Sequence, residues 1–98
     1  MLYRAGLTAA FLTLSDLGRC YAPEPEQLIR ARSTLSTLRL QMGANVVVRR
    51  NEKLIAGAGD LLDRVAITGS AVLSTGDRDD ARQFAKAMVK FIGEMEPA

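Results

Sequence analysis

The stretch "EKLIAGAGDLLDRVAITGSAVLSTGD", residues 52–77, decides the fold, because three glycines fall inside a pattern that is otherwise helical. One face of a helix would carry Leu54, Ala58, Leu61 or Leu62, Val65, Gly69 and Val72 or Leu73. This spacing predicts one long helix that begins after an Asn45 cap and runs through Ser74. The alternative is a β-hairpin within residues 46–73, because residues 46–48 are β-branched valines and the following "RRNE" suits a turn.

The three glycines are Gly57, Gly59 and Gly69, and each costs a helix interior roughly 0.5–1 kcal/mol relative to alanine. A packing role would offset that cost, because a small residue lets another backbone approach closely or admits a bulky ring. The rings available for such a contact are Phe11, Phe84 and Phe91. Three interpretations stay open: a crossing with a partner helix or a hinge, a crossing inside one bundle, or a loop that breaks the helix at residues 57–59. A phosphate-binding loop is disfavoured, since no lysine follows and the next residue is acidic.

The residues before this stretch predict two antiparallel helices. The first helix carries a stripe of Tyr3, Leu7, Ala10, Leu14, Leu17 and Tyr21, widened by Phe11 and Leu12. The second carries Leu28, Ala31, Leu35, Leu38 and Met42. Pro23 and Pro25 end the first helix, Pro25 suits the first turn of the second, and Gly43 suits its C-cap. The linker is short, so the two helices should form an αα-hairpin.

The last helix is predicted to begin after Gly76, with Asp77 as its cap and Asp79 and Asp80 in its positive first turn. Its apolar stripe comprises Ala81, Phe84, Met88, Phe91 and Met95. This spacing matches the other helices, which indicates that all of them face a common core.

The composition favours one helical domain over residues 1–98. The chain is 48% hydrophobic but only 5% aromatic and lacks tryptophan, so aliphatic residues must build its core. A chain of this length buries only somewhat more than about 60% of its unfolded surface, and small bundles often complete their burial against another chain. The predicted fold class is therefore all-α, a small antiparallel bundle of about four helices.

The charge is only mildly basic, with a formal net charge of +2 and a pI near 9.0. The cations gather in two groups, and these are the nucleic-acid candidates: Arg49, Arg50 and Lys53, and Arg82, Lys86 and Lys90. A helix with a basic face can lie along a phosphate backbone. No aromatic residue is interleaved with these cations for base stacking, however, so the pattern is more typical of a solvated face.

The residues that usually carry catalysis are missing. The sequence has no histidine, which removes the commonest general base and metal ligand. Cys20, the single cysteine, is predicted to be a small core residue rather than a nucleophile. The pairs Asp60 with Asp63 and Asp77 with Asp80 are interpreted as ion-pairing and capping residues. The sequence therefore predicts a non-enzymatic protein with no catalytic residues, cofactor or metal.

The preferred function is a protein-interaction module, an adaptor, chaperone-like or regulatory subunit that self-associates or binds a partner helix through apolar heptad faces. The candidate interface residues are Leu28, Leu35, Leu38, Met42, Gly57, Gly59, Phe84, Met88 and Phe91. The alternative is a small DNA- or RNA-associated regulator of bacterial, phage or plasmid type that uses basic faces at residues 30–53 and 82–90.

The expected compartment is the cytoplasm, because a single cysteine cannot form an internal disulfide. The alternative is a secreted or periplasmic protein in which residues 1–22 are a signal peptide, suggested by Arg4 and the apolar run after it. Asp16 and Arg19 argue against that alternative, since a cleavage region should be small and neutral. No run of residues is long and apolar enough to predict a membrane-spanning helix.

Overall fold

The structure is a computed structural model, and it describes residues 4–68 and 73–95 of the chain. These residues form five α-helices: α1 (Arg4–Gly18), α2 (Pro25–Leu40), α3 (Val46–Arg50), α4 (Glu52–Thr68) and α5 (Thr75–Met95). The all-α fold class is confirmed. The alternative hairpin is wrong, because residues 46–50 and 52–68, which would have supplied its strands, are helical.

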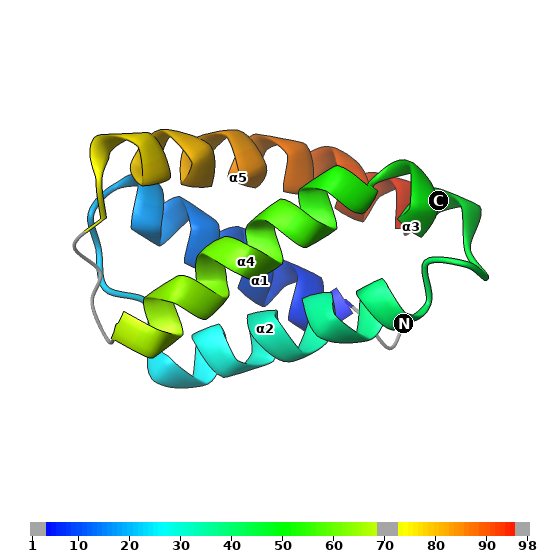
Figure 1. Cartoon of the computed structure of the whole chain (residues 1–98), viewed down its shortest axis with the longest axis horizontal. Helices are drawn as coiled ribbons and strands as arrows, with labels where there is room; N and C mark the ends of the chain where they lie inside the picture. Colours follow the sequence, from blue (N-terminus) through cyan, green and yellow to red (C-terminus); the bar gives the residue numbers. More distant parts are fainter. Residues whose placement is uncertain (1–3, 69–72, 96–98) are drawn as a thin grey trace.

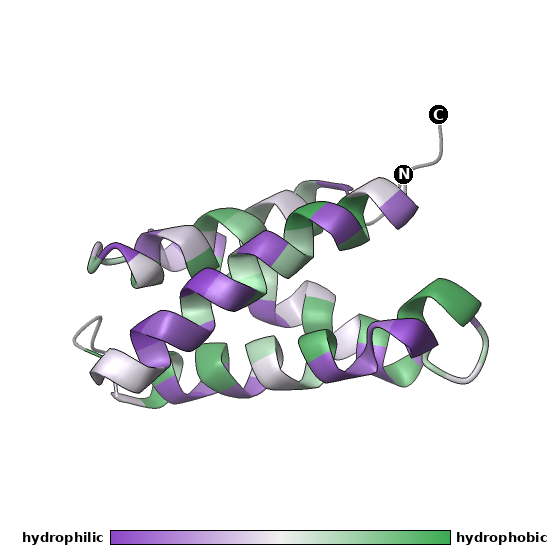
Figure 2. Cartoon of the chain, turned by 90° about the horizontal axis from the view of Figure 1, so that it is seen from above, coloured by the Kyte–Doolittle hydropathy of each residue, from purple (hydrophilic) through white to green (hydrophobic). Residues whose placement is uncertain are grey.

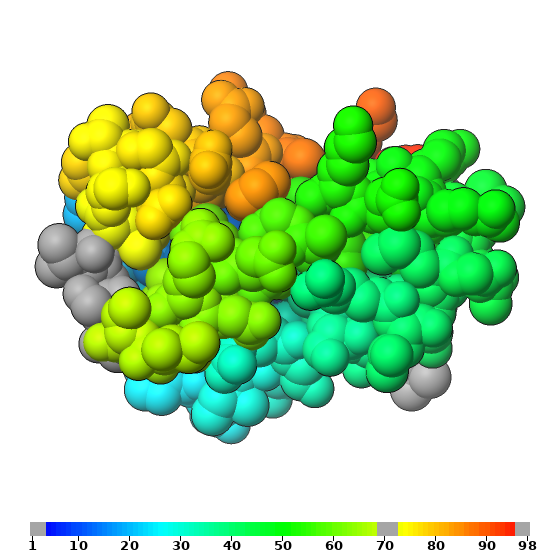
Figure 3. All heavy atoms as spheres, viewed as in Figure 1, coloured from blue at the N-terminus to red at the C-terminus, as the bar shows by residue number. Residues whose placement is uncertain are grey.

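Four long helices pack around one core. In Figure 1, α5 lies above and α2 below, while α4 crosses in front of α1. Both α1 and α4 pack against α2 and α5. Figure 3 shows α4 filling the front face between α5 and α2.

The αα-hairpin of α1 and α2 is confirmed. Gln27 Nε2 donates to Asp16 Oδ2 at 3.1 Å at one end of the pair, and Gly6 lies against Thr34 towards the other, so the helices are antiparallel. Pro25 begins α2, where its missing N–H leaves no hydrogen bond unmade.

The core is closed by the apolar stripes predicted from the sequence. Its largest fully buried apolar side chains are Leu7, Leu14, Leu17, Leu35, Leu38, Val48, Ile55, Leu61, Leu62, Met88 and Phe91. Each large apolar side chain contributes about 1.5–3 kcal/mol on full burial, so these contacts supply most of the favourable free energy of folding.

Packing within the bundle explains Gly57 but not Gly59. Gly57 and Gly59 lie inside an unbroken helix, so the interpretation of a loop at residues 57–59 is wrong. A Cβ atom built on Gly57 would lie 2.7 Å from Cζ of Phe84, so glycine makes room for that ring. A Cβ atom built on Gly59 would meet only Arg39 Nη1, at an ordinary 3.8 Å. Gly69 lies outside the described residues.

The long helix predicted from Asn45 through Ser74 is divided and shorter. The Asn45 cap is confirmed, since its side-chain oxygen accepts from the amides of Val47 and Val48 at 2.9 and 3.1 Å. Asn51 then separates α3 from α4, and its side-chain amide donates to the Val47 carbonyl at 2.8 Å. Asparagine competes in this way with the regular helical ladder. Leu73 and Ser74 are not helical, while Val72 lies outside the described residues.

Two further helix ends differ from the sequence predictions. Helix α2 ends at Leu40 rather than Met42, and Gln41 rather than Gly43 is its C-cap. Helix α5 begins at Thr75, where Ser74 Oγ accepts from the Asp77 amide at 3.1 Å. Serine therefore caps α5, and Asp77 lies within its first turn.

Cys20 is exposed, so the prediction of a core cysteine is wrong. It has a φ of 62°, the left-handed conformation that usually requires glycine. The Cys20 amide donates to the Leu17 carbonyl and the Tyr21 amide to the Asp16 carbonyl, which is the Schellman pattern of a helix end. This reversal carries Tyr21 off the buried stripe, where the sequence placed it, and leaves it exposed.

Within the described ranges, no helix has the length and apolar character required to cross a membrane.

Candidate interaction surfaces

Most of the predicted interface residues face the inside of the bundle. Leu35, Leu38, Met88 and Phe91 are fully buried within the chain itself. The other apolar candidates are partly buried and pack against the same core: Leu28, Met42 and Phe84. Gly57 lies beneath Phe84, as described above. These side chains are occupied by internal packing, so an interface on the folded chain needs other residues.

The outward face of α1 carries a second stripe that sequence reasoning missed. Ala5, Thr8 and Leu12 are exposed and Ser15 is half-buried, and their 3-4-3 spacing follows one side of the helix. No charged residue lies between Arg4 and Asp16. Figure 2, which views the molecule from the side of α5, shows strongly hydrophilic residues recurring along that helix. A surface helix normally places charges on its solvent side, so α1 departs from the usual pattern.

The outward face of α2 carries a similar stripe with 4-3-4 spacing. Its members are Ile29, Ser33, Ser36 and Leu40, and all four are exposed. Ile29 is 64% exposed and Leu40 is 87% exposed. We call these two sets the outer stripes of α1 and α2. Their signal in the sequence is the weak amphipathicity of both helices, compared with the strong amphipathicity of α4 and α5.

A groove of about 720 Å³ runs between α1 and α2. Its uncharged lining on α1 is formed by Ala5, Thr8, Ala9 and Leu12. The ionic side chains that line it are Arg4, Glu24, Glu26 and Arg30. The groove therefore combines small and apolar side chains with charges of both signs.

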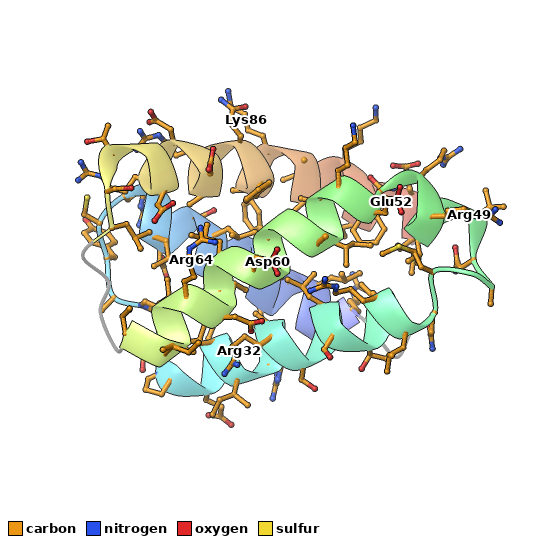
Figure 4. All side chains as sticks on the ribbon, viewed as in Figure 1. Arg32, Arg49, Glu52, Asp60, Arg64 and Lys86 are labelled. Carbon is orange, nitrogen blue, oxygen red and sulfur yellow. The ribbon has the colours of Figure 1, made fainter. Side chains whose placement is uncertain are left out.

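A second groove, of about 420 Å³, lies between α2 and α4 and includes Gly59. Two ion pairs span the same two helices: Arg32 Nε to Asp63 Oδ1 at 2.9 Å and Arg39 Nη1 to Asp60 Oδ1 at 3.4 Å. In Figure 4, Arg32 and Asp60 lie on facing sides of α2 and α4. The ion-pairing interpretation of Asp60 and Asp63 is therefore confirmed.

The basic candidates are not gathered into one free surface. Arg82 donates to the Gly18 carbonyl at 2.6 Å and pairs with Asp79, and Arg50 pairs with Glu94. The remaining candidates are exposed and form no ion pair within the part of the chain that the structure describes: Arg49, Lys53, Lys86 and Lys90. Figure 4 shows Lys86 pointing away from the middle of α5, whereas Arg49 lies at the end formed by α3.

Two further contacts join ionisable side chains of different helices and loops. Asp77 pairs with Arg64 at 3.3 Å, and Arg78 Nη1 lies 2.8 Å from the Cys20 sulfur. Across residues 4–68 and 73–95, no three His, Cys, Asp or Glu side chains are grouped so as to hold a metal ion.

Comparison of the chain with protein-family models, with curated proteins and with solved structures finds no match. A function can therefore be proposed only from the outer stripes and the charged side chains around them.

Proposed function

We propose that this protein is a non-enzymatic interaction module that binds another protein chain through the outer stripes of α1 and α2. One observation carries the proposal: both stripes are uncharged and repeat at heptad spacing, yet they lie outside a core that other residues already close. Helices bind protein partners through anchors at i, i+3, i+4 and i+7 spacing, and both stripes have that spacing.

The mechanism would be helix-on-helix packing. Exposed alanine, serine and threonine let a second helix approach closely, while Leu12, Ile29 and Leu40 supply apolar area to bury. The resulting contact would be modest and reversible, because few of its members are large. The setting we propose is the cytoplasm, since the single cysteine needs no oxidising compartment.

Nucleic-acid binding is the less favoured alternative. Lys86 and Lys90 support it, since neither forms an ion pair within the described segments. Against it, Arg50 and Arg82 are engaged with acidic partners, and further acids lie at the start of α5. If nucleic acid did bind, its affinity would fall steeply with salt concentration.

Site-specific photo-crosslinking in cells of the native host tests the proposal. A benzophenone amino acid is placed at Thr8 on the α1 stripe, at Ser33 on the α2 stripe, or at Ala87 as a matched control on exposed α5. We expect a protein adduct of defined mass from Thr8 or Ser33 and none from Ala87. Absence of an adduct from both stripes, or equal adducts from all three positions, would contradict the proposal.

A further inference from the structure

The end of the bundle where α2 is followed by α3 is uncharged along the chain. The nine residues 40–48 include no ionisable side chain. Their connection doubles back as a turn, since the Ala44 amide donates to the Gln41 carbonyl at 3.0 Å. Figure 1 shows this connection at one extremity of the longest axis of the molecule. The segment therefore forms an uncharged end of the bundle.

Aliphatic side chains at this end face solvent. Leu40 is 87% exposed, the highest value among the large apolar residues that the structure describes, and Val46 is 64% exposed. Ala44, between them in sequence, is also exposed. Single exposed apolar residues are ordinary on a protein surface, but these three belong to one short connection. We call Leu40, Ala44 and Val46 the apolar tip.

Basic residues flank the apolar tip on both sides. Arg39 precedes it in the chain, and Arg49, Arg50 and Lys53 follow it. Arg39 and Lys53 line one hollow together with Met42, so the start of α4 lies beside the end of α2. Figure 4 shows Arg49 at the same end of the molecule. The cations therefore surround the tip in space as well as in sequence.

Acidic residues do not cancel this positive charge. Arg39 and Arg50 each pair with an acid of another helix, as described above. Arg49 and Lys53 are exposed and form no ion pair within the described segments. Glu52 is the only acid in residues 39–53. Two available cations against one acid leave the surroundings of the tip positive.

We propose that this end of the bundle binds the surface of an anionic phospholipid bilayer. The apolar tip enters the interfacial layer, while Arg49 and Lys53 contact lipid phosphates. The strength of such binding depends on the apolar area that is buried and on attraction to anionic lipids, and this end supplies both contributions. Binding of this kind needs no membrane-spanning helix, since the protein lies on the bilayer.

The aliphatic side chains favour a bilayer over a nucleic acid. A phosphate backbone is bound by cations, and it would gain nothing from Leu40 or Val46. A bilayer accepts apolar side chains and presents phosphates around them. The inference goes beyond the proposed function and does not depend on it. Leu40 also ends the outer stripe of α2, so the tests below include Val46, which belongs to the tip alone.

Co-sedimentation with vesicles tests the role of the cations. The vesicles contain equal parts of phosphatidylcholine and phosphatidylserine, and pure phosphatidylcholine vesicles are the reference. Each cation near an anionic surface strengthens binding about fivefold, so Arg49→Gln with Lys53→Gln should weaken it about twentyfold. Arg30→Gln with Lys86→Gln is the matched control, because it removes the same charge from exposed positions of α2 and α5. The control should bind as wild type does.

A fluorescent probe tests entry of the apolar tip. A nitrobenzoxadiazole fluorophore is attached through Val46→Cys in a Cys20→Ser background. The matched control is Ile67→Cys, since Ile67 is 83% exposed at the other end of α4. Anionic vesicles should shift the emission of the Val46 probe to shorter wavelength and leave the Ile67 probe unchanged. Leu40→Ser should weaken vesicle binding about tenfold, because a large apolar side chain is lost, and Ile67→Ser should not.

Absence of binding to the anionic vesicles would overturn the inference, and so would equal shifts from the two probes. Equal losses from the two cation pairs would also contradict it, because binding would then follow net charge rather than this end of the bundle. Binding to duplex DNA in place of vesicles, with the same cation dependence, would assign this end to nucleic acid instead. Crosslinking from Thr8 and Ser33 tests the interaction module separately, so either proposal can fail while the other stands.

Discussion

Among the glycines of the described residues, Gly6 should tolerate replacement least. The Gly6→Ala substitution should destabilise the protein. A Cβ atom built on Gly6 would overlap Thr34 Oγ1 and would lie 2.7 Å from Thr34 Cβ. Rotation of the threonine side chain can move Oγ1 but not Cβ, which is fixed to the backbone of α2. The extra methyl group therefore has to push α1 and α2 apart.

The magnitude follows from two opposing terms. Alanine is favoured over glycine in a helix by roughly 0.5–1 kcal/mol. Forcing an extra methyl group into a closed contact costs about 1–3 kcal/mol. Because separating α1 from α2 disturbs the whole hairpin, we expect the second term to win and Gly6→Ala to lower the free energy of unfolding by about 1–2 kcal/mol. In a domain of this size that loss corresponds to a fall in melting temperature of about 4–16 °C.

Gly59→Ala is the matched control, because a Cβ atom there meets only Arg39 Nη1 at 3.8 Å. Without a clash, the helix propensity of alanine should stabilise the protein by about 0.5–1 kcal/mol. The two variants carry the same chemical change and are expected to move stability in opposite directions. Urea unfolding followed by circular dichroism measures both. A Gly6→Ala protein as stable as Gly59→Ala would refute the inferred close contact of α1 and α2.

Three further outcomes are expected. Cys20→Gly should raise the free energy of unfolding by about 1 kcal/mol, because Cys20 occupies a left-handed conformation, whereas Cys20→Ser should leave it unchanged in thermal denaturation. Leu35→Asp places a charge at a fully buried position and should abolish cooperative unfolding. The control Thr37→Asp, on the exposed side of α2, should preserve cooperative unfolding. A folded Leu35→Asp protein would show that this stripe does not belong to the core. The fragment of residues 23–98 should fail to fold, as judged by dispersion of its NMR spectrum, because it lacks the buried leucines of α1; a native-like spectrum would mean that α1 is dispensable.

Much of the fold could be predicted from local chemistry. Pro25 begins α2, Asn45 caps α3, and the inner apolar stripes form the core because spacing alone assigns residues to one helix face. Ion pairing was also predicted for Asp60 and Asp63 and is present.

Other features depend on contacts that spacing does not encode. At Asn51, the helix is interrupted where the side-chain amide donates to the Val47 carbonyl. Cys20 is exposed because it occupies the left-handed position of a helix-ending turn, where the sequence usually has glycine. Gly18 lies two residues before this turn and is packed beneath Arg82, where a Cβ atom would lie 2.6 Å from Cγ. Local sequence cannot show which residue of a distant helix lies opposite a glycine.

The candidate surface was hidden for a different reason. Ser33 and Ser36 do not count as apolar in a search for hydrophobic periodicity, so that search does not find the α2 stripe. The predicted interface residues were instead mainly the large apolar residues of each stripe. In a small bundle such residues are needed to form the core, and here they are buried.

Methyl NMR with a soluble paramagnetic agent tests the central claim most directly, because it asks whether solvent reaches the outer face of α1. Leu12 and Val89 are both exposed on the single chain, at 43% and 57%, so they form an internal comparison in the unmodified protein. When the isotope-labelled protein is placed in lysate of its native host, we predict that the Leu12 methyl signals are protected from the agent while the Val89 signals broaden, and that removing the lysate proteins removes the protection. Broadening of both residues to a similar extent with and without the lysate would contradict the assignment of this face as an interface.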